Sequence, residues 1–152
     1  MEAKRILLVE DNANDIELTL AALGERHLAN QVAVVRYGAE ALDYLYRTGS
    51  FAGHPPHHLA LVLLDLKMPK VDGLEVLRRI KGDAQLAATP VVVLTASREE
   101  SDVIQAYQSG VNAYVVKPVA FDNFVEVVKQ ISVFWLLINE TPPPAVSVCR
   151  EA

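Results

Sequence analysis

The stretch Leu61-Val62-Leu63-Leu64-Asp65 is an apolar run that ends at a carboxylate. Three more apolar runs end at a polar side chain in the same way: Ile6-Leu7-Leu8-Val9 before Glu10-Asp11, Val91-Val92-Val93-Leu94 before Thr95, and Tyr114-Val115-Val116 before Lys117. Strands buried in a parallel sheet are near-continuous apolar runs, and ligands bind outside the carboxyl ends of such strands. The four runs therefore predict a sheet edge where carboxylates, a hydroxyl and an ammonium meet.

Amphipathic segments of helix length separate these runs, which predicts strands alternating with helices in one α/β domain. A further strand is expected over 31–35 and a loop over 50–58. Two helices have starts that resemble a capping box, Asp72 with Glu75 and Ser97 with Glu100. The expected helices cover 14–24, 39–47, the segment from Asp72 to near Gly82, the segment from Ser97 to Gly110, and 122–138.

Length and composition favour a single soluble domain. The chain has 152 residues, 51% of them apolar, and we expect a domain over 1–139 followed by a flexible Pro-rich tail over 140–152. No apolar segment is long enough for a bilayer or a signal peptide, so we expect a cytoplasmic protein without a membrane partner. The formal charge of −5 and the lack of a basic patch argue against direct nucleic-acid binding. Cys149 is the single cysteine, which rules out an intrachain disulfide.

The polar residues at the strand ends suit phosphoryl chemistry. Glu10, Asp11 and Asp65 would form an acidic cluster that is costly without a cation, and such oxygen ligands suit Mg²⁺. Lys117 and the Thr95 hydroxyl would neutralise and hydrogen-bond a phosphoryl group, while Asp65 could be the carboxylate that accepts it. The predicted product is an aspartyl phosphate.

Four motifs in order resemble the receiver domain of two-component response regulators, over residues 4 to 138. They are Leu8-Val9-Glu10-Asp11-Asn12, the phosphoacceptor loop from Leu64 through Asp65-Leu66-Lys67-Met68-Pro69-Lys70 to Gly73, Val93-Leu94-Thr95-Ala96, and Val116-Lys117-Pro118. The resemblance implies a flavodoxin-like (βα)5 fold with a five-stranded parallel sheet in the order 2-1-3-4-5.

The same resemblance assigns roles to individual residues. Asp65 would take a phosphoryl group from a kinase phosphohistidine, and Lys117 would pair with its oxygens. Asp11 and Asp65 would ligate Mg²⁺ or another divalent cation directly, Glu10 would hold it through water, and the carbonyl of Lys67 would be a further ligand. Thr95 and Tyr114 would be the switch residues that report phosphorylation, and the Lys117–Pro118 bond would be cis.

Within the family, the chain is most similar to stand-alone regulators that partner phytochrome-type sensor histidine kinases. That resemblance implies a phosphorelay protein downstream of a bacteriophytochrome, without catalytic turnover of its own beyond self-phosphorylation from small donors and autodephosphorylation. It would signal through the surface of the fourth helix, fifth strand and fifth helix. Because Phe134 and Trp135 add an apolar excess to the last helix, we also expect a homodimer through that surface.

Two other functions fit parts of the pattern. An aspartyl-phosphate phosphatase also uses a strand-end Asp with Mg²⁺, but it would need a second acid where Lys67 stands. A binding module could keep the fold without being phosphorylated, although the expected site residues are present. His54, His57 and His58 lack a Cys or carboxylate companion, so we assign them no metal role.

Overall fold

Five parallel strands form one sheet in the order β2-β1-β3-β4-β5 in the computed structural model, which confirms the predicted fold class. The structure describes residues 4–25, 31–54, 58–68 and 71–142. Pro69 and Lys70 of the predicted phosphoacceptor loop, His57 and the tail from residue 143 onward lie outside these ranges. The strands are β1 (Arg5–Val9), β2 (Val32–Val35), β3 (Leu59–Leu64), β4 (Val91–Thr95) and β5 (Ala113–Val116).

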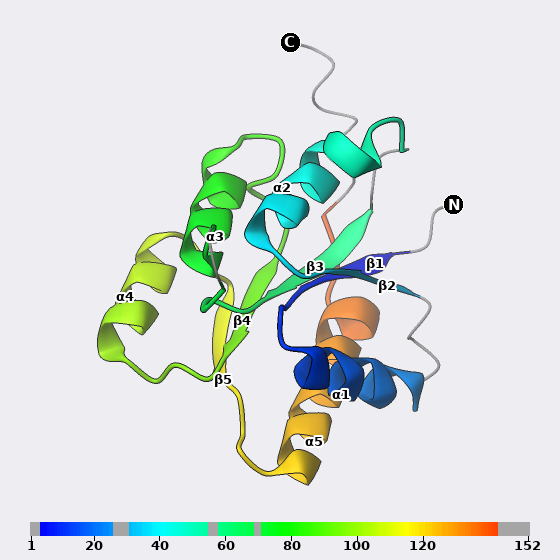
Figure 1. Cartoon of the computed structure of the whole chain (residues 1–152), viewed down its shortest axis with the longest axis vertical. Coiled ribbons are helices and arrows are strands. Elements are labelled where there is room, and N and C mark those ends of the chain that lie inside the picture. Colours follow the sequence, from blue (N-terminus) through cyan, green and yellow to red (C-terminus); the bar gives the residue numbers. More distant parts are fainter. Residues whose placement is uncertain (1–3, 26–30, 55–57, 69–70, 143–152) are drawn as a thin grey trace.

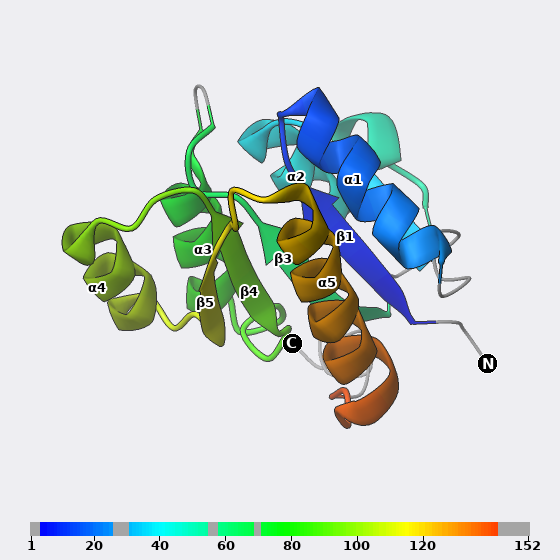
Figure 2. The ribbon, with the colours of Figure 1, turned by 90° about the horizontal axis from the view of Figure 1, so that it is seen from below.

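Helices cover both faces of the sheet, α1 and α5 on one face and α2, α3 and α4 on the other (Figures 1 and 2). Side chains alternate along β1, so that Ile6 and Leu8 pack toward α1 and α5 while Leu7 and Val9 pack toward α2 and α3. Both faces of the strand are apolar because both are covered. The helices are α1 (Ala13–Gly24), α2 (Gly38–Tyr46), α3 (Gly73–Gly82), α4 (Glu100–Gln108) and α5 (Phe121–Ser132).

One of the two predicted capping starts is correct. Asp72 caps α3, because its side chain accepts a hydrogen bond from the Glu75 backbone N–H at 3.1 Å. The predicted start at Ser97 is wrong: the cap residue of α4 is Glu99. The Ser97 hydroxyl instead donates to Asp102 at 2.5 Å and accepts from the N–H of Glu99 at 3.3 Å.

The last helix keeps its predicted extent but changes character. Beyond α5 the chain continues as a π-helical segment, η3 (Val133–Ile138). A short 3-10 turn, η2 (Gly49–Phe51), lies earlier in the chain and overlaps the start of the predicted loop over 50–58. Leu136 is buried against the sheet, whereas Phe134, Leu137 and Ile138 are exposed. The apolar excess of this segment is therefore only partly used by the core.

The strand register brings the polar strand ends together. Val9 pairs with Leu64, so Glu10 and Asp65 follow directly opposed residues of β1 and β3. Thr95 pairs with Val116, so Lys117 emerges from β5 beside the end of β4. All four strand ends open at the same edge because every strand runs in the same direction.

Candidate functional site

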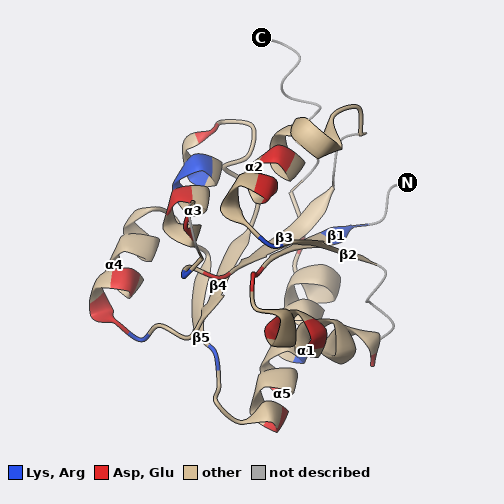
Figure 3. Cartoon of the chain, viewed as in Figure 1, with Lys and Arg blue, Asp and Glu red and all other residues tan. Residues whose placement is uncertain are grey.

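Acidic and basic side chains converge at the carboxyl end of the sheet. Figure 3 shows acidic positions where β1 and β3 end and a basic position just after β5. Glu10 and Asp65 are only 3% and 7% exposed, and Thr95 is completely buried. The sequence therefore correctly predicted that residues from four separate segments meet here.

Glu10, Asp11 and Asp65 form a compact carboxylate cluster. One oxygen of each lies within 4.8 Å of the others, close enough to share a metal ion, and no other such group of His, Cys, Asp or Glu occurs among the described residues. Backbone amides already orient two of the three: the Asn12 N–H donates to Glu10 Oε2 at 3.1 Å, and the Lys67 N–H donates to Asp65 Oδ1 at 3.3 Å. Oxygen ligands at this spacing fit a hard divalent cation.

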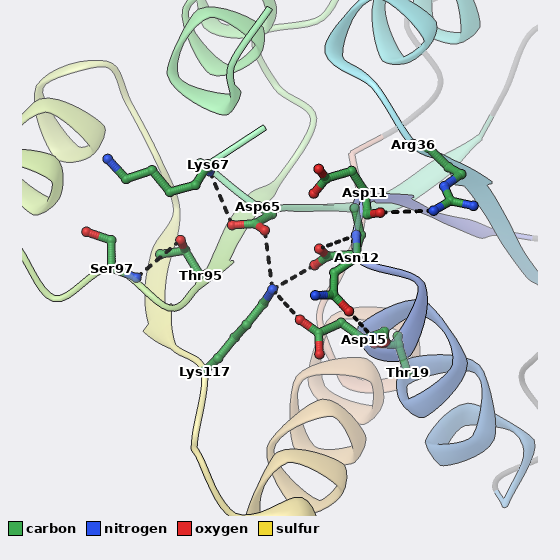
Figure 4. A network of polar contacts seen from close by, with 11 residues as sticks. Asp11, Asn12, Asp15, Thr19, Arg36, Asp65, Lys67, Thr95, Ser97 and Lys117 are labelled. Carbon is green, nitrogen blue, oxygen red and sulfur yellow. Dashed lines mark hydrogen bonds and ion pairs between the residues drawn. The ribbon is translucent and has the colours of Figure 1, made fainter. Parts of the chain in front are cut away.

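Lys117 places an ammonium in the middle of the site. Its Nζ lies 3.2 Å from Asp65 Oδ2 and 2.9 Å from Glu10 Oε1 (Figure 4). The predicted cis bond before Pro118 is wrong, since the described residues contain no cis peptide bond. The ordinary trans form, which most X-Pro bonds adopt, already delivers the ammonium to both carboxylates.

Asp15 is a member of the site that the sequence analysis missed. It sits in the first turn of α1, and its Oδ2 lies 2.7 Å from Lys117 Nζ, closer than either strand-end carboxylate. Asn12 caps α1 by accepting a hydrogen bond from the Asp15 N–H at 3.0 Å. The position of Asp15 in the sequence could have predicted this contact. Side chains in the first turn of a helix tilt back toward its N-terminus, and α1 begins at the site.

Burial and crowding of charge alter the protonation of the cluster. Burial, together with the nearby charge of Asp65, raises the pKa of Glu10 to about 7, although Lys117 opposes the shift. Burial alone would lower the pKa of Lys117, but its hydrogen bond to Asp15 and the charges of Asp65 and Glu10 outweigh this and raise it above its ordinary value. Lys117 thus favours its charged form, while Glu10 takes up a proton more readily than an ordinary glutamate.

Thr95 and Tyr114 lie beside the cluster and are connected through Ser97. The Thr95 hydroxyl accepts a hydrogen bond from the Ser97 N–H at 3.4 Å, and the Tyr114 hydroxyl donates to the Ser97 carbonyl at 3.1 Å. The Tyr114 ring is half-buried against the core on the side of α2, α3 and α4. Both predicted switch residues therefore contact the same loop residue.

A second connection was also missed by the sequence analysis. Lys67 forms an ion pair with Asp102 of α4, Nζ to Oδ2 at 3.0 Å, and Ser97 donates to the same oxygen. Lys67 lies in the loop after β3 and Asp102 lies in α4, so no local sequence pattern indicates this ion pair. The loop after Asp65 is thereby tied to the helix that follows Thr95.

The arrangement can support transfer of a phosphoryl group to a carboxylate. Asp65 offers an oxygen nucleophile, the neighbouring carboxylates can hold a cation, and Lys117 brings a fixed positive charge within 3.2 Å of the nucleophile. Such groups neutralise the charge of phosphoryl oxygens without any covalent role of their own.

Comparison with known sequences identifies relatives over most of the chain. The probable methanogenesis regulatory protein FilR2 of Methanothrix harundinacea is 41% identical over 92% of this chain and 88% of its own length. The response regulator Rcp1 of Synechocystis sp. is 39% identical over 88% of this chain and 89% of its own. Both are therefore similar over nearly their full lengths.

Solved structures of response regulators are also similar to this chain over most of its length. The phosphorylated cyanobacterial phytochrome response regulator RcpA has a TM-score of 0.86 at 41% identity, covering 93% of this chain and 99% of that one. The Mn²⁺-bound form of Rcp1 has a TM-score of 0.85 at 38% identity, covering 91% and 99%. The bacteriophytochrome response regulator AtBRR is 56% identical with a TM-score of 0.72, covering 92% and 100%.

The family description matches the region that carries the site. Residues 6–129, which include every strand end described above, match the response regulator receiver domain. None of the helices in the described part of the chain has the length and apolar character of a membrane span. The chain belongs to the response regulator receiver family, and the relatives to which it is similar include response regulators of phytochromes.

Proposed function

We propose that Asp65 accepts a phosphoryl group from the phosphohistidine of a sensor histidine kinase in a phosphorelay. The observation that carries this proposal is the position of the Asp65 carboxylate, which lies 3.2 Å from Lys117 Nζ and within 4.8 Å of the oxygens of Glu10 and Asp11. The carboxylate attacks phosphorus and the bond from phosphorus to the histidine nitrogen breaks, with Lys117 pairing with the phosphoryl oxygens. The similarity to phosphorylated RcpA supports this chemistry.

The carboxylate cluster would hold Mg²⁺. Asp11 and Asp65 would be direct ligands, Glu10 would act through water, and the Lys67 carbonyl would add another oxygen. When bound, the cation neutralises phosphoryl charge and compensates the repulsion among the three carboxylates. The Mn²⁺-bound form of the similar protein Rcp1 supports a divalent cation at this place.

The kinase partner would be of the phytochrome type. The similarity to RcpA and AtBRR, which are response regulators of a cyanobacterial phytochrome and of a bacteriophytochrome, supports this partner. Phosphorylation would be reported by Thr95 and Tyr114, which both contact Ser97 at the start of the loop to α4. The predicted cytoplasmic location and the 1–139 extent of the receiver domain stay predictions.

A homodimer would form through α4, β5 and α5. β5 is an edge strand of the sheet, and Ile104 and Tyr107 expose about half of their side chains on α4, at 48% and 54%. Exposed apolar groups beside an unpaired strand edge favour association. Sedimentation of the purified chain with and without a phosphoryl mimic is expected to give a dimer; a monomer at high concentration in both conditions would contradict the proposed interface.

The proposal excludes a phosphatase that turns over free substrates. Such an enzyme needs a general acid two residues after the nucleophile, where this chain has Lys67. The pKa of Lys67 is raised, first by its hydrogen bond to Asp102, so its ammonium is a poor proton donor at neutral pH. The residues instead suit a phosphoacceptor that hydrolyses only its own aspartyl phosphate.

Incubation with acetyl phosphate and Mg²⁺ tests the proposed function. Intact mass of the wild-type chain is expected to show one added phosphoryl group, which Asp65→Asn abolishes and EDTA prevents. Glu126→Gln is the control, because it removes one negative charge from an exposed position in the middle of α5. Equal labelling of the wild type and Asp65→Asn would contradict the role of Asp65. Labelling of neither would contradict the phosphoacceptor function itself.

A further inference from the structure

Asp102 is a buried carboxylate of α4 to which the proposed reaction assigns no role. It is only 7% exposed, and a single oxygen, Oδ2, accepts both the hydrogen bond from the Ser97 hydroxyl at 2.5 Å and the ion pair from Lys67 Nζ at 3.0 Å. The hydrogen bond from Ser97, followed by that from Lys67, lowers the pKa of Asp102. One ionised oxygen thus fixes side chains from two different loops.

Both partners of Asp102 lead back to the phosphoacceptor site. Lys67 donates its backbone N–H to Asp65 Oδ1 at 3.3 Å, so its side chain starts at the rim of the site. Ser97 donates its backbone N–H to the Thr95 hydroxyl at 3.4 Å. Lys67 therefore links Asp102 to Asp65, and Ser97 links Asp102 to Thr95.

The direction of the Lys67 side chain decides what Asp102 does. Figure 4 shows this side chain extended away from the Asp65 carboxylate, and 60% of its surface is exposed. A lysine carries a mobile point charge on a flexible stem, and a phosphoryl group two residues away would attract it. The buried carboxylate of Asp102 competes for that charge.

We propose that Asp102 is a positioning residue, which holds the Lys67 ammonium on α4 and leaves a phosphoryl group on Asp65 open to water. The inference rests on the proposed function. The affected step is hydrolysis: a water oxygen bonds to phosphorus, the bond from phosphorus to the Asp65 oxygen breaks, Asp65 regains its carboxylate, and inorganic phosphate leaves with the protons of the water. Without the Asp102 charge, Lys67 pairs with the phosphoryl oxygens and blocks the approach of water.

The test measures the lifetime of the phosphoryl group after removal of acetyl phosphate, in excess Mg²⁺. Asp102→Asn is expected to hydrolyse about fivefold more slowly than the wild type, the effect of an ion pair worth about 1 kcal/mol. Glu100→Gln is the matched control, because it removes one negative charge from an exposed position of the same helix and should leave the lifetime unchanged.

A double substitution separates positioning from a structural role. Lys67→Met alone is expected to leave the lifetime within about twofold of the wild type, because the ammonium is already held away, and Asp102→Asn should have no effect in the Lys67→Met background. If Asp102→Asn still slows hydrolysis in the Lys67→Met chain, the proposal is overturned, because the effect then does not depend on Lys67. An unchanged or shorter lifetime in Asp102→Asn would overturn it as well.

Two further outcomes are also decisive. If Asp102→Asn fails to fold, Lys67→Met still tests the proposal, and a lifetime changed by more than about twofold would overturn it. If the wild-type chain takes up no phosphoryl group, the proposed function fails and this inference fails with it. If the wild type is labelled normally and Asp102→Asn has the same phosphoryl lifetime as the wild type, only the positioning role of Asp102 is contradicted.

Discussion

Lys117 lies closer to Asp15 than to Asp65: its Nζ is 2.7 Å from Asp15 Oδ2 and 3.2 Å from Asp65 Oδ2. Asp15 comes from the first turn of α1, whereas Asp65 directly follows β3. The ammonium that would bind the phosphoryl oxygens is therefore engaged by a carboxylate that has no part in accepting the phosphoryl group. Asp15 competes with the phosphoryl group for Lys117.

Asp15→Asn is expected to speed phosphorylation by acetyl phosphate by up to about fivefold, because a partly exposed ion pair contributes at most about 1 kcal/mol. Initial rates of mass labelling at saturating Mg²⁺ measure the effect. Glu17→Gln removes the same charge from an exposed position of α1 and serves as control. A labelling rate for Asp15→Asn that equals the control would show that Asp15 does not restrain Lys117.

Loss of Lys117 is expected to destabilise the chain strongly when no cation is present. Its side chain is 10% exposed and compensates three carboxylates, so Lys117→Met leaves buried negative charge unpaired at a cost of about 3–5 kcal/mol. Urea unfolding at pH 8 in EDTA measures this loss. Saturating Mg²⁺ should restore more stability to Lys117→Met than to the wild type; equal stabilisation of both chains would argue against a cation bound in this cluster.

Glu10 makes the stability of the metal-free chain depend on pH. Its pKa is raised from 4.5 to about 7, so between these values the folded chain holds a proton that the unfolded chain has lost. The Glu10 contribution to the free energy of unfolding must then decrease as pH rises from 4.5 to 7 and stay constant above. Glu10→Gln is expected to lack this decrease in urea titrations with EDTA, and an identical pH profile for both chains would refute the raised pKa.

Gly73 sets how closely α3 approaches Asp65. A Cβ at this position would lie 2.2 Å from the Asp65 carbonyl oxygen and 2.6 Å from Leu66 Cα, which are backbone atoms that cannot move aside cheaply. Gly73→Ala should cost about 1–3 kcal/mol of stability and slow labelling of Asp65. Gly82→Ala, at the other end of α3 with no atom within 4 Å of the added carbon, is the control and should leave labelling unchanged.

The sequence predicted the parts of the site that parallel strands impose. Apolar runs indicate where strands end, and the common direction of the strands brings Glu10, Asp65, Thr95 and Lys117 to one edge. This reasoning needs no knowledge of side-chain packing. The fold class and the meeting of these residues were accordingly correct.

The parts that the sequence did not predict depend on tertiary packing. Ser97 matched a helix-capping pattern, but a buried carboxylate from α4 takes its hydroxyl instead. The Lys67–Asp102 ion pair joins residues that are distant in the chain, and no local periodicity encodes such a contact. The end of α5 in a π-helical segment likewise has no signature in the spacing of apolar residues.

Locating the phosphoryl group on the chain tests the central claim most directly. Borohydride reduces an aspartyl phosphate to homoserine, so phosphorylation by acetyl phosphate and Mg²⁺, reduction, proteolysis and peptide sequencing by mass spectrometry identify the residue. We expect homoserine at position 65 and at no other acidic residue of the site. Homoserine at position 11 or 15, or 5-hydroxynorvaline (the product from a glutamyl phosphate) at position 10, with position 65 unmodified, would contradict the assignment of Asp65 as the phosphoacceptor.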